Sequence, residues 1–400
     1  MDDSSRQKLA LSASRDLFFS ILAMIVYNGV LQLFIYPGLN DGMGAEAFGT
    51  VLYLISVVSI MGAGFGTAAS YSRMVAKKER TEANGDYNLF LLIVSGISVV
   101  VTFFALFVLK ELTAALYIQV LALMIATVVR AYSDVEYRMN IRFVDYFLFY
   151  TALSAGYIVG LFLYPFTHNW VITIILGELF GIIYTVIRGH IFRPPFAAFS
   201  KAYIENLKSS FVISVSNLLA VLILNSDRIL LRLLVGAKEV TVFYTASLIG
   251  KIVAMLTTPL NGVIISYFTG YDLKLKKKLF LLICALAVAG SALAAVICSF
   301  ISRIFVKFMY PEVLVEAEEF FFLANLGQIL YFVSGSLMVI VLSFTKEKLQ
   351  LYINMIYGVA FLAIVIPMTC LFGLEGLAIG LVVVNVLRLL ATAVCGLRHL

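Results

Sequence analysis

The sequence has little charge. Only 13% of its 400 residues are charged, whereas soluble domains carry about a quarter. Apolar residues make up 62% of the chain, and the mean hydropathy is +1.02. This composition excludes a soluble globular protein and predicts an integral membrane protein that is solvated by lipid. The net charge of +6 does not require a nucleic-acid partner, because membrane topology and attraction to anionic headgroups explain it.

Motifs that would carry chemistry are also missing. The four cysteines all lie in apolar segments. They form neither a disulfide framework nor a metal-ligand spacing, so we expect packing residues and no metal. No Walker sequence GxxxxGK[ST] occurs, which excludes direct ATP hydrolysis. The short connections "YPFTHNW" and "LFGLE" hold no pair of catalytic carboxylates. We therefore expect neither an enzyme nor a cofactor.

Long apolar runs fill most of the chain instead. Twelve segments are long enough to span a bilayer: 17–39, 48–70, 88–109, 112–129, 143–164, 169–187, 209–233, 240–268, 279–302, 317–344, 350–371 and 375–397. They are continuously apolar, so they do not fit the alternating strands of a barrel. Lys110 and Glu111 alone separate the third and fourth segments, which predicts a tight hairpin. We predict an all-α integral membrane fold of twelve transmembrane helices, in two six-helix lobes around a central cavity.

The basic residues indicate the orientation. Lysine and arginine gather in alternate connections, such as 73–80 and 188–208. The positive-inside rule places these connections and both termini in the cytoplasm. Because 188–208 lies at the midpoint, we divide the chain into 1–200, a six-helix lobe with a cytoplasmic linker, and 201–400, a second six-helix lobe.

A short internal echo supports this division, with chance as the alternative. "GAEAFGTVLYLIS" (44–56) follows the first segment, and "GAKEVTVFYTASL" (236–248) follows the seventh. Parallel repeats of this kind place a substrate site between lobes, near the membrane midplane.

Polar residues recur at helical spacing inside several apolar segments. They are Ser210, Ser214, Asn217, Asn225, Arg228 and Arg232 in the seventh; Tyr244, Ser247 and Lys251 in the eighth; Asn385, Arg388 and Thr392 in the twelfth; and Asn28 and Gln32 in the first. Polar groups in lipid are costly, so we expect these faces to turn toward protein or water. Two alternatives stay open. Arg228 and Arg232 can snorkel to headgroups, and Lys251 and Arg388 can form buried ion pairs with Asp227 or Glu178.

The sign of the central charge favours an anionic ligand. Arg228, Lys251 and Arg388 outnumber the acids Asp227 and Glu178. A positive cavity attracts anions, and the arginine fork matches phosphate oxygens in pairs. Glu178 is the one acid deep in the first six segments. It can neutralise a basic side chain or titrate in a proton or sodium cycle, which makes it the candidate for ion coupling.

Three motifs carry a resemblance to a known family. They are "GMGAEAFGTVLYLIS" after the first segment, "NSDRILLRLLVGAKEVTVFYTASLIGK" across the seventh and eighth, and "FGLEGLAIGLVVVNVLR" in the twelfth. With twelve spans, the chain resembles the polysaccharide transporters of the multidrug/oligosaccharidyl-lipid/polysaccharide (MOP) flippase superfamily. The resemblance implies a flippase that carries an undecaprenyl-diphosphate-linked oligosaccharide across the bacterial inner membrane, by alternating access, for surface polysaccharide biosynthesis.

The resemblance and the residues together suggest which side chains bind. The diphosphate would contact Arg228, Lys251 and Arg388, with Asp227 orienting one of them. The sugars would contact Asn28, Gln32, Asn217, Asn225 and Tyr244. The expected partners are the lipid-linked oligosaccharide, membrane lipids and a polysaccharide polymerase complex, and we expect a monomer. The alternatives are a cation-coupled multidrug exporter of the same superfamily, a polymerase or ligase of polysaccharide assembly, and a non-transporting scaffold.

Overall fold

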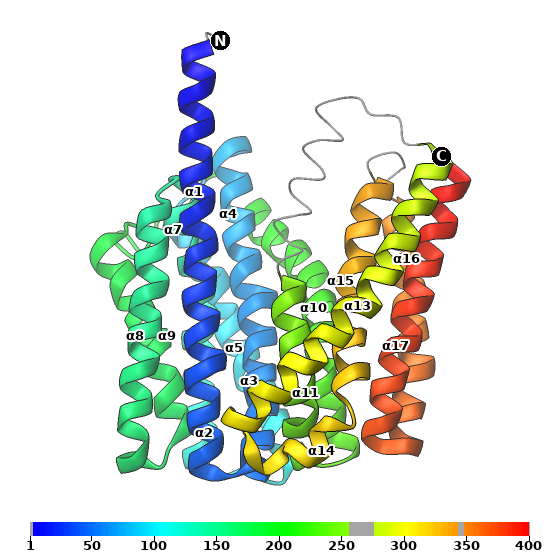
Figure 1. Cartoon of the computed structure of the whole chain (residues 1–400). Coiled ribbons are helices and arrows are strands. Elements are labelled where there is room, and N and C mark those ends of the chain that lie inside the picture. The colour runs from blue at the N-terminus through cyan, green and yellow to red at the C-terminus, as the bar shows by residue number, and fades with distance from the viewer. Residues whose placement is uncertain (1–2, 256–275, 343–347, 400) are drawn as a thin grey trace. The chain divides into compact units, whose positions relative to one another are not determined.

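The described residues fold almost entirely into helices, most of them long (Figure 1). The computed structural model describes residues 3–255, 276–342 and 348–399, and these residues contain no strand. They divide into two compact units. Unit 1 comprises Met1–Gly44 and Val51–Ile229, and unit 2 comprises Ala45–Thr50 and Leu230–Leu400.

Unit 1 is built from the first ten α-helices and two π-helical turns. They are α1 (Asp3–Val30), η1 (Leu31–Ile35), α2 (Tyr36–Met43), α3 (Ala45–Met61), η2 (Gly62–Gly66), α4 (Thr67–Glu79), α5 (Asn84–Leu109), α6 (Ala114–Ser133), α7 (Val135–Met139), α8 (Phe143–Thr167), α9 (Trp170–Arg188) and α10 (Tyr203–Leu234). The first residues of α3 and the last residues of α10 belong to unit 2.

Unit 2 holds the remaining helices of the described chain. They are α11 (Ala237–Met255), α13 (Lys277–Met309), η3 (Pro311–Val313), α14 (Leu314–Glu318), α15 (Phe321–Leu342), α16 (Lys348–Ala360), η4 (Phe361–Val365) and α17 (Ile366–His399).

The predicted all-α membrane fold is confirmed. Ten helices of the described residues are long and apolar enough to cross a membrane. One of them, Tyr352–Arg398, contains the twelfth predicted span and all but the first two residues of the eleventh. The described part of the eighth predicted span forms α11, and its remainder, 256–268, lies outside the described residues. The last residues of the tenth span, 343–344, also lie outside them.

The tight turns fall where short polar or glycine-containing breaks interrupt the apolar runs. Lys110 caps α5 in the left-handed conformation, with φ 59°, and α6 starts at Ala114, so the predicted hairpin is confirmed. Gly373 has φ 59° and ψ −132° inside α17. That conformation suits glycine, which has no Cβ, and it separates the eleventh span from the twelfth.

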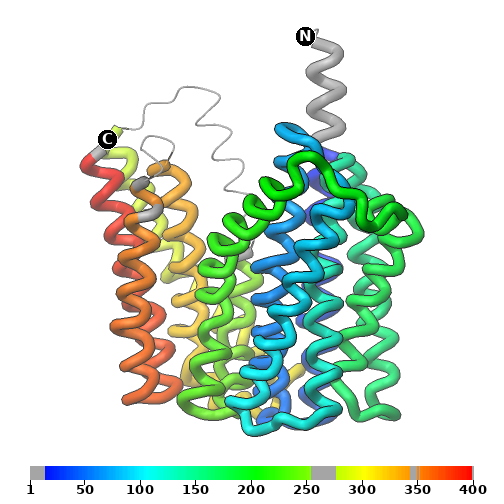
Figure 2. Tube along the Cα trace, turned by 180° about the vertical axis from the view of Figure 1, so that it is seen from behind, coloured from blue at the N-terminus to red at the C-terminus, as the bar shows by residue number. Residues whose placement is uncertain are grey.

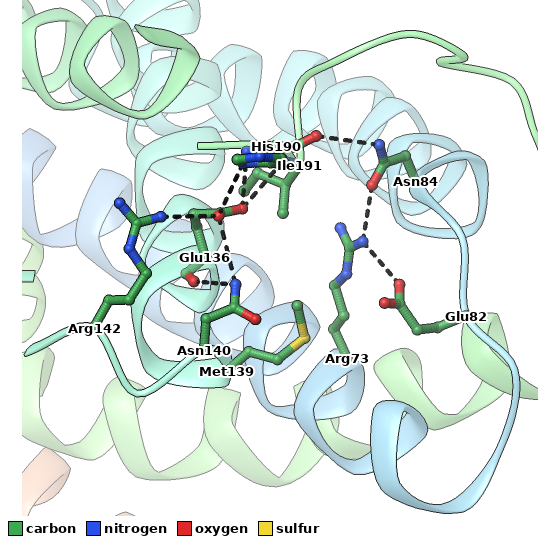
Figure 3. A pocket seen from close by; sticks show the side chains of 9 residues that line it. All are labelled: Arg73, Glu82, Asn84, Glu136, Met139, Asn140, Arg142, His190 and Ile191. Atoms are coloured by element: carbon green, nitrogen blue, oxygen red, sulfur yellow. Dashed lines mark hydrogen bonds and ion pairs between the residues drawn. The ribbon is translucent and has the colours of Figure 1, made fainter. Parts of the chain in front are cut away.

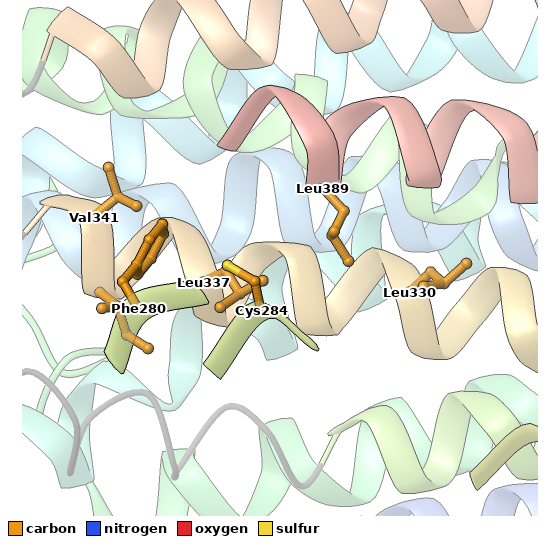
Figure 4. Packing of buried hydrophobic residues seen from close by; sticks show 7 residues of the cluster. Phe280, Cys284, Leu330, Leu337, Val341 and Leu389 are labelled. Atoms are coloured by element: carbon orange, nitrogen blue, oxygen red, sulfur yellow. The ribbon is translucent and has the colours of Figure 1, made fainter. Parts of the chain in front are cut away.

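A buried apolar cluster joins three helices of unit 2 (Figure 4). Phe280 and Cys284 of α13 pack against Leu330 and Leu337 of α15. Leu389 of α17 completes the contact. Cys284 is buried as a small apolar residue, the role predicted for the cysteines. Burial of this kind fixes α13, α15 and α17 relative to one another.

Both segments of the sequence echo begin a helix, α3 and α11. The backbone oxygen of Ala45 accepts a hydrogen bond from Thr241 Oγ1 at 2.6 Å. A Cβ at Gly49 would lie 1.7 Å from the oxygen of Ala237, so glycine is required at that approach. The division of the sequence at residue 200/201 remains a prediction, because the compact units follow a different course through α3 and α10.

Candidate functional site

A buried ion pair lies inside unit 1. Glu178 of α9 is 2% exposed. Its Oε2 accepts a hydrogen bond from Arg130 Nε of α6 at 2.6 Å, and its Oε1 accepts one from Arg130 Nη2 at 3.4 Å. Tyr157 of α8 donates to Oε1 at 2.6 Å. The arginine also lies 5.9 Å from the ring centroid of Tyr27 on α1. Four helices therefore converge on one neutralised charge pair.

The glycines beside Glu178 make room for these partners. A Cβ at Gly177 would lie 2.0 Å from the ring of Tyr157, and one at Gly181 would lie 3.3 Å from Arg130 Cγ. The sequence "GELFG" thus brings the carboxylate, the tyrosine and the arginine within hydrogen-bond distance. Sequence reasoning missed Arg130, because it directly follows the apolar segment 112–129 and lies near other basic residues, as residues of a cytoplasmic connection do.

The polar residues of α10 in unit 1 also contact protein groups. Asn225 Nδ2 donates to the backbone oxygen of Val221 at 2.9 Å, within its own helix. Arg228 Nη1 donates to Ser56 Oγ of α3 at 3.4 Å, so its guanidinium points at protein. Asp227 is 3% exposed. A buried tyrosine that the sequence did not single out, Tyr36, lies within electrostatic range of Arg228 and of Glu178.

Arg388 of unit 2 has different surroundings from Arg130 and Arg228 of unit 1. The guanidinium carbon of Arg388 lies 4.8 Å from the ring centroid of Tyr331 and 5.0 Å from that of Tyr357. Its Nη1 donates to the backbone oxygen of Tyr331 at 3.4 Å. In the part of the chain that the structure describes, no carboxylate lies within ion-pair distance of Arg388. The predicted buried ion pair is therefore replaced there by aromatic faces and one carbonyl.

The neighbours of Arg388 on α17 face the same helix. Asn385 Nδ2 donates to the backbone oxygen of Gly327 on α15 at 2.9 Å, and Thr392 is fully buried. The polar stripe of the twelfth span thus turns toward α15 and not toward lipid, as the cost of polar groups in hydrocarbon requires.

The other predicted contact residues are distributed along both units. In unit 1, Asn28 Nδ2 donates to the oxygen of Met24 at 2.9 Å. Gln32 lies in η1, and Asn217 is half-buried on α10. In unit 2, Tyr244 is buried among the rings of Phe48 and Tyr310, and Arg232 Nε donates to Thr50 Oγ1 at 3.2 Å. Lys251 is half-buried near the end of the described part of α11.

A polar pocket of about 480 Å³ lies at the end of unit 1 where the basic connections gather (Figure 3). Arg73 Nη2 lies 2.8 Å from Glu82 Oε2 on one wall, and Arg142 Nη1 lies 3.7 Å from Glu136 Oε1 on the other. Glu136 Oε2 also accepts the backbone N–H of His190 at 3.1 Å. Because the charges are balanced inside the pocket, they supply no net attraction for an anion.

The connection between α9 and α10, residues 189–202, crosses the same end of unit 1 (Figure 2). Asp86 of α5 accepts the backbone N–H of Ser200 at 2.9 Å and its hydroxyl at 2.6 Å. Gly85 N–H donates to the oxygen of Ala198 at 3.0 Å. A Cβ at Gly85 would lie 2.4 Å from that oxygen. The segment predicted to be a linker is thus tied to α5 by backbone and side-chain bonds.

These features define a multi-pass membrane protein with buried cations. The described residues hold no group of His, Cys, Asp and Glu suited to a metal ion. The chain belongs to the polysaccharide biosynthesis protein family, whose model matches residues 15–272. A search of curated proteins finds no match.

Solved structures of MOP-superfamily transporters share the fold. The lipid II flippase MurJ, in an inward closed conformation, has a TM-score of 0.68 and 14% identity, over 94% of this chain and 86% of that chain. A multidrug resistance MATE family transporter of the MOP superfamily, facing inward, has a TM-score of 0.65 and 12% identity, over 95% and 97%. An outward-facing structure of such a transporter has a TM-score of 0.60 and 14% identity, over 96% and 94%. The expected polysaccharide family is confirmed by the family model, and the expected fold is confirmed by these structures.

Proposed function

We propose that this protein is a flippase that moves an undecaprenyl-diphosphate-linked oligosaccharide from the inner to the outer leaflet of the bacterial inner membrane, for surface polysaccharide biosynthesis. The family membership and the shared fold support this role. The protein is not an enzyme in this proposal, and it works by alternating access. It acts as a monomer that delivers its product to a polysaccharide polymerase complex.

Arg388 is the observation that carries the proposal. A half-buried guanidinium inside a membrane helix, with no carboxylate beside it in the described chain, is costly unless a ligand or water compensates the charge. A diphosphate supplies the charge and the paired oxygens that an arginine fork binds. The buried carboxylates of the described residues, Asp16, Asp86, Asp134, Glu136, Glu178 and Asp227, all belong to unit 1.

Within each unit taken by itself, several residues are proposed to contact the substrate. Those of unit 2 are Arg388 and Lys251 for the diphosphate and Tyr244 for a sugar. Those of unit 1 are Arg228, oriented by Asp227, for the diphosphate, and Asn28, Gln32, Asn217 and Asn225 for sugars. The amide N–H groups of Asn28 and Asn225 already donate within their helices. Their amide oxygens are therefore the atoms proposed to accept from sugar hydroxyls.

Glu178 is the proposed coupling residue, with the membrane potential or a cation gradient as the energy source. Protonation would remove its attraction for Arg130, which holds it at 2.6 Å. Transport of this kind should depend on pH or sodium, and Glu178→Gln should abolish that dependence. Unchanged ion dependence at normal protein level would remove Glu178 from the coupling.

The alternative is a cation-coupled multidrug exporter, and the carboxylates buried in unit 1 favour it. A deletion strain distinguishes the two. The flippase predicts loss of surface polysaccharide, restored by the wild-type chain and not by Arg388→Ala at equal membrane level. The exporter predicts drug sensitivity with normal polysaccharide, an outcome that would overturn the proposal. A non-transporting polymerase or ligase predicts that lipid-linked units still reach the outer leaflet.

The proposed orientation places both termini and residues 189–202 in the cytoplasm. Ala197 is exposed in this segment. On a cysteine-free background, Ala197→Cys should react with an impermeant thiol reagent only after the cells are opened. Labelling in intact cells would reverse the topology.

A further inference from the structure

Three helices of unit 2 enclose the guanidinium of Arg388. Tyr331 comes from α15, Tyr357 from α16 and the arginine from α17. The two ring centroids lie 6.0 Å apart, with the rings tilted by 49°. Both lie within the distance at which a ring face attracts a cation. The rings limit the orientations that the planar guanidinium can take.

The N–H donors of this guanidinium differ in whether they have an acceptor. Nη1 donates to the backbone oxygen of Tyr331. Nε is shielded from solvent and has no acceptor within the described chain. The Nε–H and one N–H of Nη2 point the same way, and together they form one side of the arginine fork. A buried donor without an acceptor costs free energy, so a ligand that supplies two oxygens there would recover it.

Aromatic faces and carboxylates differ in their effect on the net charge of an arginine site. A carboxylate orients an arginine and also cancels its charge, as Glu178 does for Arg130 in unit 1. A tyrosine face orients the cation and leaves the net charge in place. The surroundings of Arg388 therefore hold the group in position without neutralising it, which suits the binding of an anion.

We propose that Tyr331 and Tyr357 are positioning residues that clamp Arg388, so that its Nε–Nη2 edge binds two oxygens of a phosphate-type anion. This proposal rests on the proposed function, because it supplies the diphosphate subsite of that substrate. The bond from Asn385 to Gly327 holds α17 against α15 and so keeps the arginine level with Tyr331.

Binding to the purified full-length protein in nanodiscs tests the clamp. Farnesyl diphosphate is the probe, and farnesol is the matched ligand without the anion. Arg388→Ala and Arg388→Lys should both weaken diphosphate affinity, by roughly 10- to 100-fold, because lysine keeps the charge and loses the fork. Tyr331→Leu and Tyr357→Leu should each weaken it about 3- to 30-fold. The Phe variants keep the ring face and should stay within about twofold of the wild type.

The Phe variants separate positioning from packing. If a Leu variant is monodisperse, melts like the wild type and still binds the diphosphate as tightly, the clamp is wrong. Equal losses in the Phe and Leu variants would show that the hydroxyl groups matter and not the ring faces, and would also overturn it. A wild-type protein that binds farnesol and farnesyl diphosphate equally has no anion subsite here.

Failure of the clamp is distinguishable from failure of the flippase. If polysaccharide export depends on the protein but the Leu variants bind the diphosphate as tightly as the wild type, the flippase proposal would be supported. The clamp would then be wrong. If the purified variants show the expected affinities but a deletion strain still exports polysaccharide, the clamp would be supported and the flippase proposal would be wrong.

Discussion

In unit 1, Arg130 is 12% exposed and faces Glu178 at 2.6 Å, whereas in unit 2, Arg388 lies between two tyrosine rings. Both are arginines within membrane-spanning helices. The charge of Arg130 is cancelled by Glu178. The charge of Arg388 is not cancelled by any carboxylate of the described residues. The Arg130–Glu178 pair therefore connects helices of unit 1, whereas no described carboxylate cancels the charge of Arg388 in unit 2.

This contrast separates stability from function. A buried pair is strongly destabilised when one partner is removed, because the other charge is left uncompensated. A buried cation that no carboxylate neutralises carries part of that cost already, so its removal should harm binding and spare the fold. The predictions below test whether the two arginines differ in this way, beginning with the largest effect.

Breaking the Arg130–Glu178 pair should have the largest effect on stability. Arg130→Gln or Glu178→Gln alone should destabilise the protein by about 3–5 kcal/mol, seen as a lower melting temperature and a lower yield of monodisperse protein. The double variant carries no isolated charge and should regain a large part of the loss. A double variant as unstable as the sum of the single ones would mean that the two side chains do not interact.

Arg388→Gln should show the reverse pattern. Export should fall by roughly 10- to 100-fold, because a charge-assisted contact with the diphosphate is lost. The melting temperature should stay level or rise, because a buried cation is removed. Arg130→Gln is the matched control. A melting temperature that drops as far in Arg388→Gln as in Arg130→Gln would erase the distinction between the two units.

The same two arginines show what sequence reasoning can find. The apolar runs have the length of a membrane span, and short breaks such as Lys110–Glu111 mark the hairpins, so the helical architecture was predictable. The stripe that contains Asn385 and Arg388 was visible, because its spacing is local. The partners were not, because Glu178 and Arg130 are 48 residues apart. Which distant side chain compensates a charge depends on helix packing, which the spacing of one helix does not encode.

The connection after α9 shows the same limit. The basic residues of 188–208 and its place at the midpoint of the chain indicated a linker between lobes, whereas the structure ties 189–202 to α5. Asp86 was not singled out, because a carboxylate at the start of a helix is ordinary in sequence. Its function depends on a serine 114 residues away.

Crowding at Gly85 should have an intermediate effect. Gly85→Ala places a methyl group 2.4 Å from the backbone oxygen of Ala198, so we expect a loss of about 1–3 kcal/mol and faster proteolysis within 189–202. Gly96→Ala lies on the same helix, where nothing lies within 4 Å of the added Cβ. It should be neutral or stabilise by up to about 1 kcal/mol. Equal proteolysis in the two variants would show that the segment is not held by α5.

The smallest effect should come from an ion pair that unit 2 carries at its surface. Lys238 Nζ lies 2.6 Å from Glu316 Oε1, but the two side chains are 48% and 47% exposed. Water and salt screen such a pair, so its coupling energy should be about 0–1 kcal/mol and should decrease further as ionic strength rises. A double-mutant cycle of Lys238→Ala and Glu316→Ala, followed by thermal unfolding at low and at high salt, measures it. The pair is close to the length of the Arg130–Glu178 contact, so the two cycles compare burial at nearly equal distance. A coupling near that of the buried pair would mean that distance, and not burial, sets the value of charge pairs in this protein.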